Sequence, residues 1–216
     1  MYILLTAATS FEIDPTLAIL EKNEFNFNDH EIDILITGIG QAAATYLLTY
    51  NIQNKRPDLV IQAGIAGSFG NGVLLEQTVL VKQEAFGDLG MEEKAIFTSV
   101  FDAGFANKNN HPFTDGWLIN EHPLLDNTAL QIVKGVTVNK VSDSSVQKQQ
   151  LINCFAPQIE TMEGAALHYV CLQENVPFIQ VRSISNAVGE RDKGKWKTTE
   201  AIGNLNRELQ YLISTL

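Results

Sequence analysis

Residues 160–196 read ETMEGAALHYVCLQENVPFIQVRSISNAVGERDKGKW, and this stretch decides the fold. Its Ala-rich part predicts a helix over 163–174, because alanine has the highest helix propensity. The apolar run that follows predicts a strand over 177–183 that closes on the basic residue Arg182, and the Ser-x-Ser-Asn sequence after it is interpreted as a turn. A helix that leads directly into an apolar strand is typical of a layered α/β fold.

The same alternation of short apolar strands and helices continues over the rest of the chain. Strands are predicted at 2–7, 31–38, 59–63, 78–82 and 131–138, and helices from Asp14-Pro15 onward, at 41–52, from the Ser142–Ser144 cap to about 154, and at 199–214. This order predicts a single domain over 1–216, built as a three-layer αβα sandwich around a central mixed, largely parallel sheet.

Composition limits the partners of the chain. Its 216 residues carry a formal net charge of −10, which disfavours nucleic acid and anionic membrane surfaces as partners. No apolar run approaches the roughly 20 residues of a membrane span. The N-terminus lacks the basic region of a signal peptide, so a cytoplasmic location is expected.

The cysteines and histidines show no metal-ligand spacing. Cys154 and Cys171 stand among apolar neighbours and are expected to be buried free thiols. The four histidines, at 30, 111, 122 and 168, are scattered along the chain, and His168 is expected in the core or partly exposed. Neither a metal nor another cofactor is therefore predicted.

A binding site is expected where the parallel strands end, because ligands of open α/β sheets bind beyond the carboxyl ends of the strands. Those ends carry Ala7-Ala8, Gly38–Gly40, Gly64–Gly67 and Arg182–Asn186. Glycine allows a close approach of backbone to ligand. Neither glycine segment matches a dinucleotide fingerprint or a P-loop, and both are also consistent with simple tight turns.

Three charged residues have competing interpretations. Arg182 closes a predicted central strand, so it either meets a partner or ligand or extends to solvent at the edge of the sheet. Glu163 at a helix start is also explained by the helix dipole alone. Glu12, expected in the loop after the first strand, is also explained as a solvated acid at the start of a helix.

Taken together, five blocks resemble the superfamily of nucleoside phosphorylases and nucleosidases. They are Glu12, TGIGQAAA from Thr37, QAGIAG from Gln62, TMEGAA from Thr161 and VPFIQVRSISN from Val176. The resemblance extends along nearly the whole chain. It implies a nucleoside phosphorylase-like fold and hydrolysis of a purine N-glycosidic bond.

The resemblance also implies roles for individual residues. Glu12 matches the carboxylate that activates water, and Glu163, beside Met162, matches the ribose ligand. Arg182 matches the arginine that would keep Glu163 ionised, and Ser185 matches the serine that orients the group facing the base. The remaining implied contacts to ribose and base are Gly64, Ile65, Ala66, Gly67 and the backbone of Val141.

One position departs from the adenine-releasing members, which carry Asp where this chain has Asn186. A protonated Asp can act as a general acid toward N7 of the purine, whereas an Asn can only donate a hydrogen bond. Asn186 therefore favours a 6-oxopurine such as hypoxanthine as the leaving base.

Three further segments resemble the futalosine hydrolase subfamily: FGDLGME from Phe86, TVNKVS from Thr137, and RSISN followed by ERD and a Trp. This implies cleavage of futalosine, a 6-oxopurine nucleoside with an aromatic carboxylate at its 5′ end, to hypoxanthine and dehypoxanthine futalosine in menaquinone biosynthesis. The alternatives are another purine nucleosidase or phosphorylase, acting on inosine or methylthioadenosine, and a nucleoside-binding protein without catalysis.

Water is favoured over phosphate as the nucleophile. No Arg precedes Arg56 and no Lys precedes Lys22, so the predicted turn at 38–40 has no cation close to it in sequence to hold a phosphate. The substrate's 5′ carboxylate has three candidate partners, Lys82, Lys140 and Arg191. Asp88 either contacts substrate or organises its own loop.

The segment 86–121 has little periodicity and is long for a passive loop. The resemblance implies a homodimer or a larger homo-oligomer, and this segment is a candidate for the contact surface. Its aromatic residues are Phe101, Phe105, Phe113 and Trp117.

Overall fold

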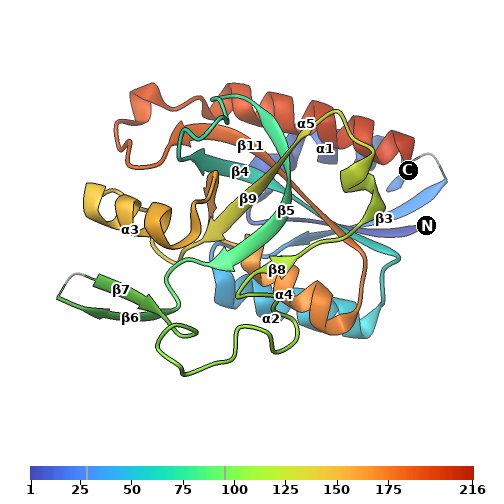
Figure 1. The fold of residues 1–216 in the computed structure, drawn as a ribbon. Helices are drawn as coiled ribbons and strands as arrows, with labels where there is room; N and C mark the ends of the chain where they lie inside the picture. The colour runs from blue at the N-terminus through green and yellow to red at the C-terminus, as the bar shows by residue number, and fades with distance from the viewer. Residues whose placement is uncertain (28, 95) are drawn as a thin grey trace.

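The computed structural model describes residues 1–27, 29–94 and 96–216 (Figure 1). The strands are β1 (Tyr2–Ala7), β2 (Asn26–Phe27), β3 (His30–Ile36), β4 (Leu59–Ser68), β5 (Thr78–Phe86), β6 (Gly90–Glu93), β7 (Ile96–Ser99), β8 (Leu118–Ile119), β9 (Gln131–Thr137), β10 (Ile159–Thr161) and β11 (Phe178–Ala187). The helices are α1 (Ser10–Lys22), α2 (Gln41–Asn54), α3 (Ser145–Phe155), α4 (Gly164–Glu174) and α5 (Thr198–Thr215), with short 3-10 turns at Pro123–Asp126 and Lys193–Lys195.

Nine strands of the described chain form one mixed sheet in the order β10-β9-β5-β11-β4-β1-β3-β2, with β8 added beside β5. The strands β3, β1, β4 and β11 are neighbours and run parallel, whereas β5 runs antiparallel to β11. The short strand β10 pairs with both β9 and β4, so one half of the sheet closes on itself. The prediction of a mixed, largely parallel sheet is confirmed.

Helices cover both faces of the sheet, as the three-layer prediction requires (Figure 1). Alternate residues of a strand point to opposite faces. In β1, Ile3 and Leu5 pack into the core that contains α1 and α5, while Leu4 packs into the core that contains α2 and α4. Each strand in the middle of the sheet is therefore buried on both sides.

Strands β4 and β11 continue through two segments that the sequence predicts as turns. These segments, 64–67 and 183–186, pair with each other in parallel, and Gly64 lies beside Arg182 in the register. The turn predictions are wrong because side chains of β11 fill the space beside the glycines of β4, which keeps the ladder intact. By contrast, Gly38 and Gly40 do form a turn, with φ of +73° and +98°.

The segment 86–121 folds back on its own domain. It forms the β6–β7 hairpin and then a loop in which Phe113 packs on Phe101 and on Tyr169 of α4, with ring centroids 5.1 and 6.0 Å apart. Of the four aromatic residues predicted for a contact surface, only Phe105 is largely exposed, at 75%.

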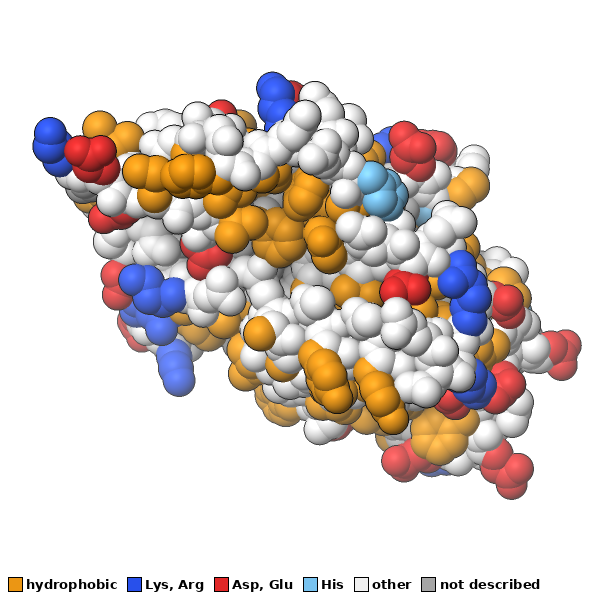
Figure 2. Space-filling model, turned by 90° about the horizontal axis from the view of Figure 1, so that it is seen from below, with side chains coloured by type: hydrophobic (Ala, Val, Ile, Leu, Met, Phe, Trp, Pro, Cys, Tyr) orange, Lys and Arg blue, Asp and Glu red, His pale blue; other side chains and the backbone are white. Residues whose placement is uncertain are grey.

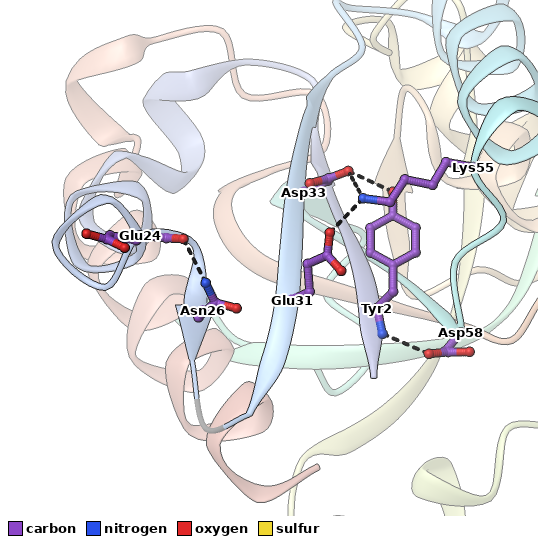
Figure 3. A network of polar contacts seen from close by, with 7 residues as sticks. All are labelled: Tyr2, Glu24, Asn26, Glu31, Asp33, Lys55 and Asp58. Atoms are coloured by element: carbon purple, nitrogen blue, oxygen red, sulfur yellow. Dashed lines mark hydrogen bonds and ion pairs between the residues drawn. The ribbon is translucent and has the colours of Figure 1, made fainter.

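An ion-pair network lies at the end of the sheet where β1 and β3 begin, opposite to the carboxyl ends of these strands (Figure 3). Lys55, just after α2, lies 2.9 Å from Glu31 and 2.8 Å from Asp33 of β3, and the Tyr2 hydroxyl donates to Asp33. The Lys55 ammonium lowers the pKa of Asp33, while burial raises the pKa of Tyr2 to about 12. Such exposed pairs contribute little to stability.

Two further expectations concern solvent exposure and membranes. Cys171 is buried as predicted, but Cys154 is exposed because it lies on the outer side of α3, and both thiols are free. In the described chain, every helix falls short of the length and apolar content that a membrane span demands.

Candidate active site

A cavity of about 340 Å³ opens where β3, β1, β4 and β11 end, which is the predicted location. It is lined by Ala8, Thr9, Phe11, Glu12, Ile39, Ile65, Ala66, Gly67, Val141, Ser142, Glu160, Thr161, Met162, Glu163, Ser185, Asn186, Gly189, Glu190, Arg191 and Trp196. Most of the predicted site residues thus meet at one place, although they come from distant parts of the chain.

Glu12 lies in the first turn of α1, not in a loop. The helix begins after Thr9, whose backbone N–H donates to the Glu12 carboxylate at 3.1 Å. The predicted start at Asp14-Pro15 is wrong because Thr9-x-x-Glu12 is a capping box, a signal that is readable in the sequence. The other carboxylate oxygen of Glu12 accepts the Ile65 N–H at 3.0 Å. Both oxygens are therefore fixed, and Glu12 is only 7% exposed.

The helix α5 also holds Glu12 in place. Asn206 is buried, and its amide donates to the Glu12 carbonyl at 2.9 Å. Its amide oxygen accepts from the backbone N–H and the hydroxyl of Thr16. The backbone of α1 near the cavity is thereby tied to the C-terminal helix.

Glu163 is the N-cap of α4, and its carboxylate accepts the Gly40 N–H at 2.8 Å. Burial raises the pKa of the Glu163 carboxyl, whereas the charge of Arg182 and the Gly40 N–H lower it, and the Glu12 charge raises it further. Arg182 therefore acts in the direction that the resemblance implies, but burial outweighs it.

Arg182 is buried in the middle of the sheet and does not extend to solvent. Its side chain is 1% exposed, and Nη2 donates to Gln62 at 2.6 Å. Its Nε has no hydrogen-bond partner in the part of the chain that the structure describes. A Cβ at Gly64 would overlap Nη1 of Arg182 and would lie 2.9 Å from the Glu12 carboxylate. Only glycine leaves room here for both charged groups.

Ser185 and Asn186 lie in the last part of β11. The Ser185 hydroxyl donates to the Asn186 amide oxygen at 2.8 Å, and the amide nitrogen donates to the Ala187 carbonyl at 2.9 Å. Because the oxygen is occupied by a donor, the amide presents N–H and not a lone pair to a ligand.

Besides the candidate cations Lys82 and Lys140, three predicted site residues lie outside the cavity lining. Arg182 and Gly64 are beneath it. Asp88 borders a second cavity of about 460 Å³ near the β6–β7 hairpin and α3, where it accepts the Asn139 N–H at 2.7 Å. This contact joins the loop of Asp88 to the segment that follows β9.

Several lining residues have no counterpart in the predicted site. Glu160 lies in β10, a short strand that the sequence did not reveal, and accepts from the Ser142 N–H at 3.1 Å. Burial raises the pKa of Glu160. Trp196 donates from its indole to the Glu190 carbonyl, and the Arg191 guanidinium lies 5.9 Å from the Trp196 ring centroid.

Comparisons with known proteins place the chain in one superfamily. The model of the phosphorylase superfamily matches residues 24–215. The futalosine hydrolase of Thermus thermophilus is 31% identical over 183 residues, which are 83% of this chain and 80% of that protein. A 5′-methylthioadenosine/S-adenosylhomocysteine nucleosidase of Buchnera aphidicola is 23% identical over 74% of this chain and 69% of its own length.

A solved structure shares the fold. The 5′-methylthioadenosine/S-adenosylhomocysteine nucleosidase of Neisseria meningitidis superposes with a TM-score of 0.82 at 18% identity, covering 100% of this chain and 99% of that one. The similarity in three dimensions therefore extends over the whole chain.

The glycine beside Arg182 gives a test of the site. Gly64→Ala should lower the free energy of unfolding by about 1–3 kcal/mol, because the methyl group displaces the guanidinium. Gly203→Ala is the matched control, since Gly203 lies in α5 with open space around it, and it should stabilise by about 0.5–1 kcal/mol. Equal effects of the two variants in chemical denaturation would contradict the close approach.

Proposed function

We propose, from the premise that this chain belongs to the phosphorylase superfamily, that it hydrolyses the N-glycosidic bond of a purine nucleoside, and that this nucleoside is futalosine. The observation that carries the proposal is the convergence of two fixed carboxylates and one amide on a single cavity. Glu12, Glu163 and Asn186 line it together, and their chemistries match the three needs of nucleoside hydrolysis.

Nucleoside hydrolysis needs stabilisation of the sugar, activation of the water and stabilisation of the leaving base. The first two concern Glu163 and Glu12. When the bond from C1′ to the base nitrogen breaks, the ribosyl fragment gains positive charge and the base takes the electron pair. Glu163 binds the ribose hydroxyls, and its attraction grows as that charge develops. Glu12 accepts a proton from the water whose oxygen forms the new bond to C1′.

The third need is the leaving base. An amide that donates N–H stabilises the lone pairs of N7 or O6 of a 6-oxopurine as electron density builds up on the base. The hydrogen bond from Ser185 favours this orientation of the Asn186 amide. Hypoxanthine is therefore favoured over adenine as the product.

The charges around the cavity support water as the nucleophile. Arg191 is the one basic residue among the described residues that line it, and Glu12, Glu160, Glu163 and Glu190 are acidic. Arg56 precedes β4, at the opposite end of the strand, where it donates to the Asn175 carbonyl. A phosphate dianion would meet predominantly negative charge here.

The three candidate cations for the 5′ carboxylate of futalosine are separated by their positions. Arg191 lines the cavity, beside Trp196. Lys140 lines the second cavity, and Lys82 lies 3.9 Å from Asp126. We assign the carboxylate to Arg191, with the Trp196 ring beside the aromatic part of the substrate.

A homo-oligomer, most simply a homodimer, is the expected assembly. Figure 2 shows hydrophobic side chains exposed on the face seen from below. On and just before α2, Ile39, Tyr46 and Tyr50 are 64%, 67% and 57% exposed, and the two tyrosine rings stack with centroids 6.2 Å apart. Ile39 also lines the cavity, so a partner that covers this stripe would lie near its mouth.

A base-release assay tests the function. Futalosine, inosine and methylthioadenosine are incubated with the protein, with and without phosphate, and the free base is followed. Hypoxanthine release from futalosine without phosphate is expected, and Glu12→Gln should abolish it while nucleoside binding persists. Phosphate-dependent release indicates a phosphorylase, adenine release alone indicates a methylthioadenosine nucleosidase, and absence of release from all three indicates a binding protein.

Base preference is tested at one position. Asn186→Asp should lower kcat/KM for hypoxanthine nucleosides by about 10- to 100-fold, because an ionised carboxylate leaves the base acceptors unpaired. The same variant should gain activity on methylthioadenosine when the Asp is protonated. An unchanged ratio of the two activities would show that base preference resides elsewhere.

The role of Arg191 is tested with a substrate pair. Arg191→Gln should raise KM for futalosine about three- to tenfold and leave inosine unaffected, since only futalosine carries the carboxylate; the effect should shrink at high salt. Lys140→Gln, at the second cavity, is the matched control and should change neither value. Equal effects of Arg191→Gln on both substrates would refute the assignment.

A further inference from the structure

A chain of buried polar side chains lies beneath the cavity and has no role in the reaction described so far. It consists of Glu84 on β5, Gln180 on β11 and His168 on α4, and all three are 0% exposed. Gln180 Nε2 lies 2.9 Å from a Glu84 carboxylate oxygen. At the other end, His168 Nδ1 lies 3.0 Å from the Leu118 carbonyl.

When Glu84 is ionised and His168 is neutral, the donors and acceptors of this row of three side chains cannot all be paired. A carbonyl only accepts, so Nδ1 of His168 carries the proton, and Nε2 of a neutral ring is then an acceptor. Gln180 is the side chain close enough to this ring to act on its pKa. With its NH2 group turned to Glu84, it offers the ring only another acceptor. Both Gln180 Oε1 and His168 Nε2 are indeed buried without a partner among the described residues.

Two protonation patterns remove the mismatch. In one, His168 is an imidazolium and Glu84 a carboxylate. In the other, Glu84 is protonated and the Gln180 amide is rotated, so that its oxygen accepts from Glu84 and its nitrogen donates to His168. The amide permits either orientation, because its oxygen and nitrogen have nearly the same shape. The first pattern buries two charges, whereas the second buries none.

We propose that Glu84 is a neutral carboxylic acid that acts as a positioning residue. Its proton is donated to Gln180 Oε1, Gln180 Nε2 donates to His168 Nε2, and His168 Nδ1 donates to the Leu118 carbonyl. Each group in this row then donates to the next one, from Glu84 to the Leu118 carbonyl. No buried polar atom of Gln180 or His168 remains unpaired.

The electrostatic environment favours the same pattern. Burial raises the pKa of Glu84 to about 7, against the hydrogen bond from Gln180 and the charge of Arg182. Burial lowers the pKa of His168 to about 4. Ionising Glu84 would also recreate the mismatch at Gln180. Both pKa shifts therefore act in the direction of a neutral Glu84 and a neutral His168.

Among the described residues, the fixed charge that acts on Glu84 is that of Arg182 on β11. The other neighbouring elements present Thr137 on β9, Thr161 on β10, Leu118 on β8 and the N-terminus of α4, which Glu163 caps. Because Glu84 is neutral, the charge of Arg182 remains available to Glu163.

Glu84 also positions the first turn of α4. Its carboxyl group contacts the hydroxyls of Thr137 and Thr161 at 3.0 and 3.2 Å. Those hydroxyls accept the backbone N–H groups of Ala165 and Gly164, at 2.7 and 3.3 Å. Since Glu163 immediately precedes these residues, the neutral network fixes the backbone from which the Glu163 side chain extends.

The first arm of the test is spectroscopic. Nitrogen NMR of isotope-labelled protein at pH 7 should show His168 as a neutral ring protonated at Nδ1, with the other three histidines assigned by replacing them one at a time. The His168 signals should not titrate between about pH 7 and 5, since the pKa lies near 4. An imidazolium at pH 7 would overturn the proposal.

The second arm compares two variants of Glu84. Glu84→Gln keeps the shape of a neutral acid and, like it, both donates and accepts hydrogen bonds. The kcat for base release at pH 7 should therefore stay within about threefold of wild type. Glu84→Met has similar size but removes one hydrogen-bond partner each from Gln180, Thr137 and Thr161, and kcat should fall more than tenfold. Equal losses in both variants would mean that the negative charge is required and would overturn the proposal.

The third arm uses pH and separates this proposal from the proposed function. A pKa raised on folding stabilises the protein below the unfolded value of about 4.5, and the stabilisation is lost as the pH rises through about 7. The stability of wild type relative to Glu84→Gln should therefore decline over this range. A constant difference would contradict the neutral acid.

The kinetic arm rests on the proposed function, but the NMR and stability arms do not. A failure of the neutral-acid proposal can therefore be distinguished from a failure of the proposed function.

Discussion

The buried charge of Arg182 is the constraint on which the rest of the site depends. A guanidinium cannot lose its proton in a protein, so its burial at 1% exposure requires compensating groups around it. The fold supplies an amide oxygen from Gln62 at 2.6 Å and, farther away, the carboxylate of Glu163, whose pKa it lowers. Two of the cavity carboxylates lie near this cation: its charge acts on Glu163, and Glu12 approaches it beside Gly64.

Two glycines of β4 leave room for side chains of the next strand and its continuation, and Gly64 does so for the cation. At Gly64, a Cβ would overlap the guanidinium, and at Gly67 it would lie 3.1 Å from Val188. The pairing of β4 with β11 is kept because the missing side chains on one strand are replaced by Arg182 and its neighbours on the other. The same close approach allows the Ile65 N–H to reach Glu12, so the glycines serve packing and site geometry together.

The polar groups of the site are fixed by backbone more than by one another. Glu12 accepts from Ile65 and Thr9, Glu163 accepts from Gly40, and the N-terminus of α4 rests on two threonine hydroxyls. These backbone donors lie in β4, at the N-cap of α1 and in the turn before α2, so the carboxylates are preorganised before any substrate binds. A neutral Glu84 beneath them completes this arrangement without adding another charge.

The sequence by itself determined the class of fold and most members of the site. Alternating apolar strands and helices predicted the layered sheet, and the ends of those strands predicted the edge at which a site would lie, because these patterns depend on local periodicity and strand direction. The resemblance to the superfamily, and not the periodicity, pointed to Glu12, Glu163 and Asn186 as members of that site. The tertiary structure alone decided that β4 and β11 continue through 64–67 and 183–186, that Arg182 is buried, and that Asp88 lies outside the cavity. It also brought Glu84, Gln180 and His168 together beneath the cavity. These features depend on which side chain fills the space beside a glycine and which polar atoms face each other across the sheet, and neither is encoded in the spacing of residues along one strand.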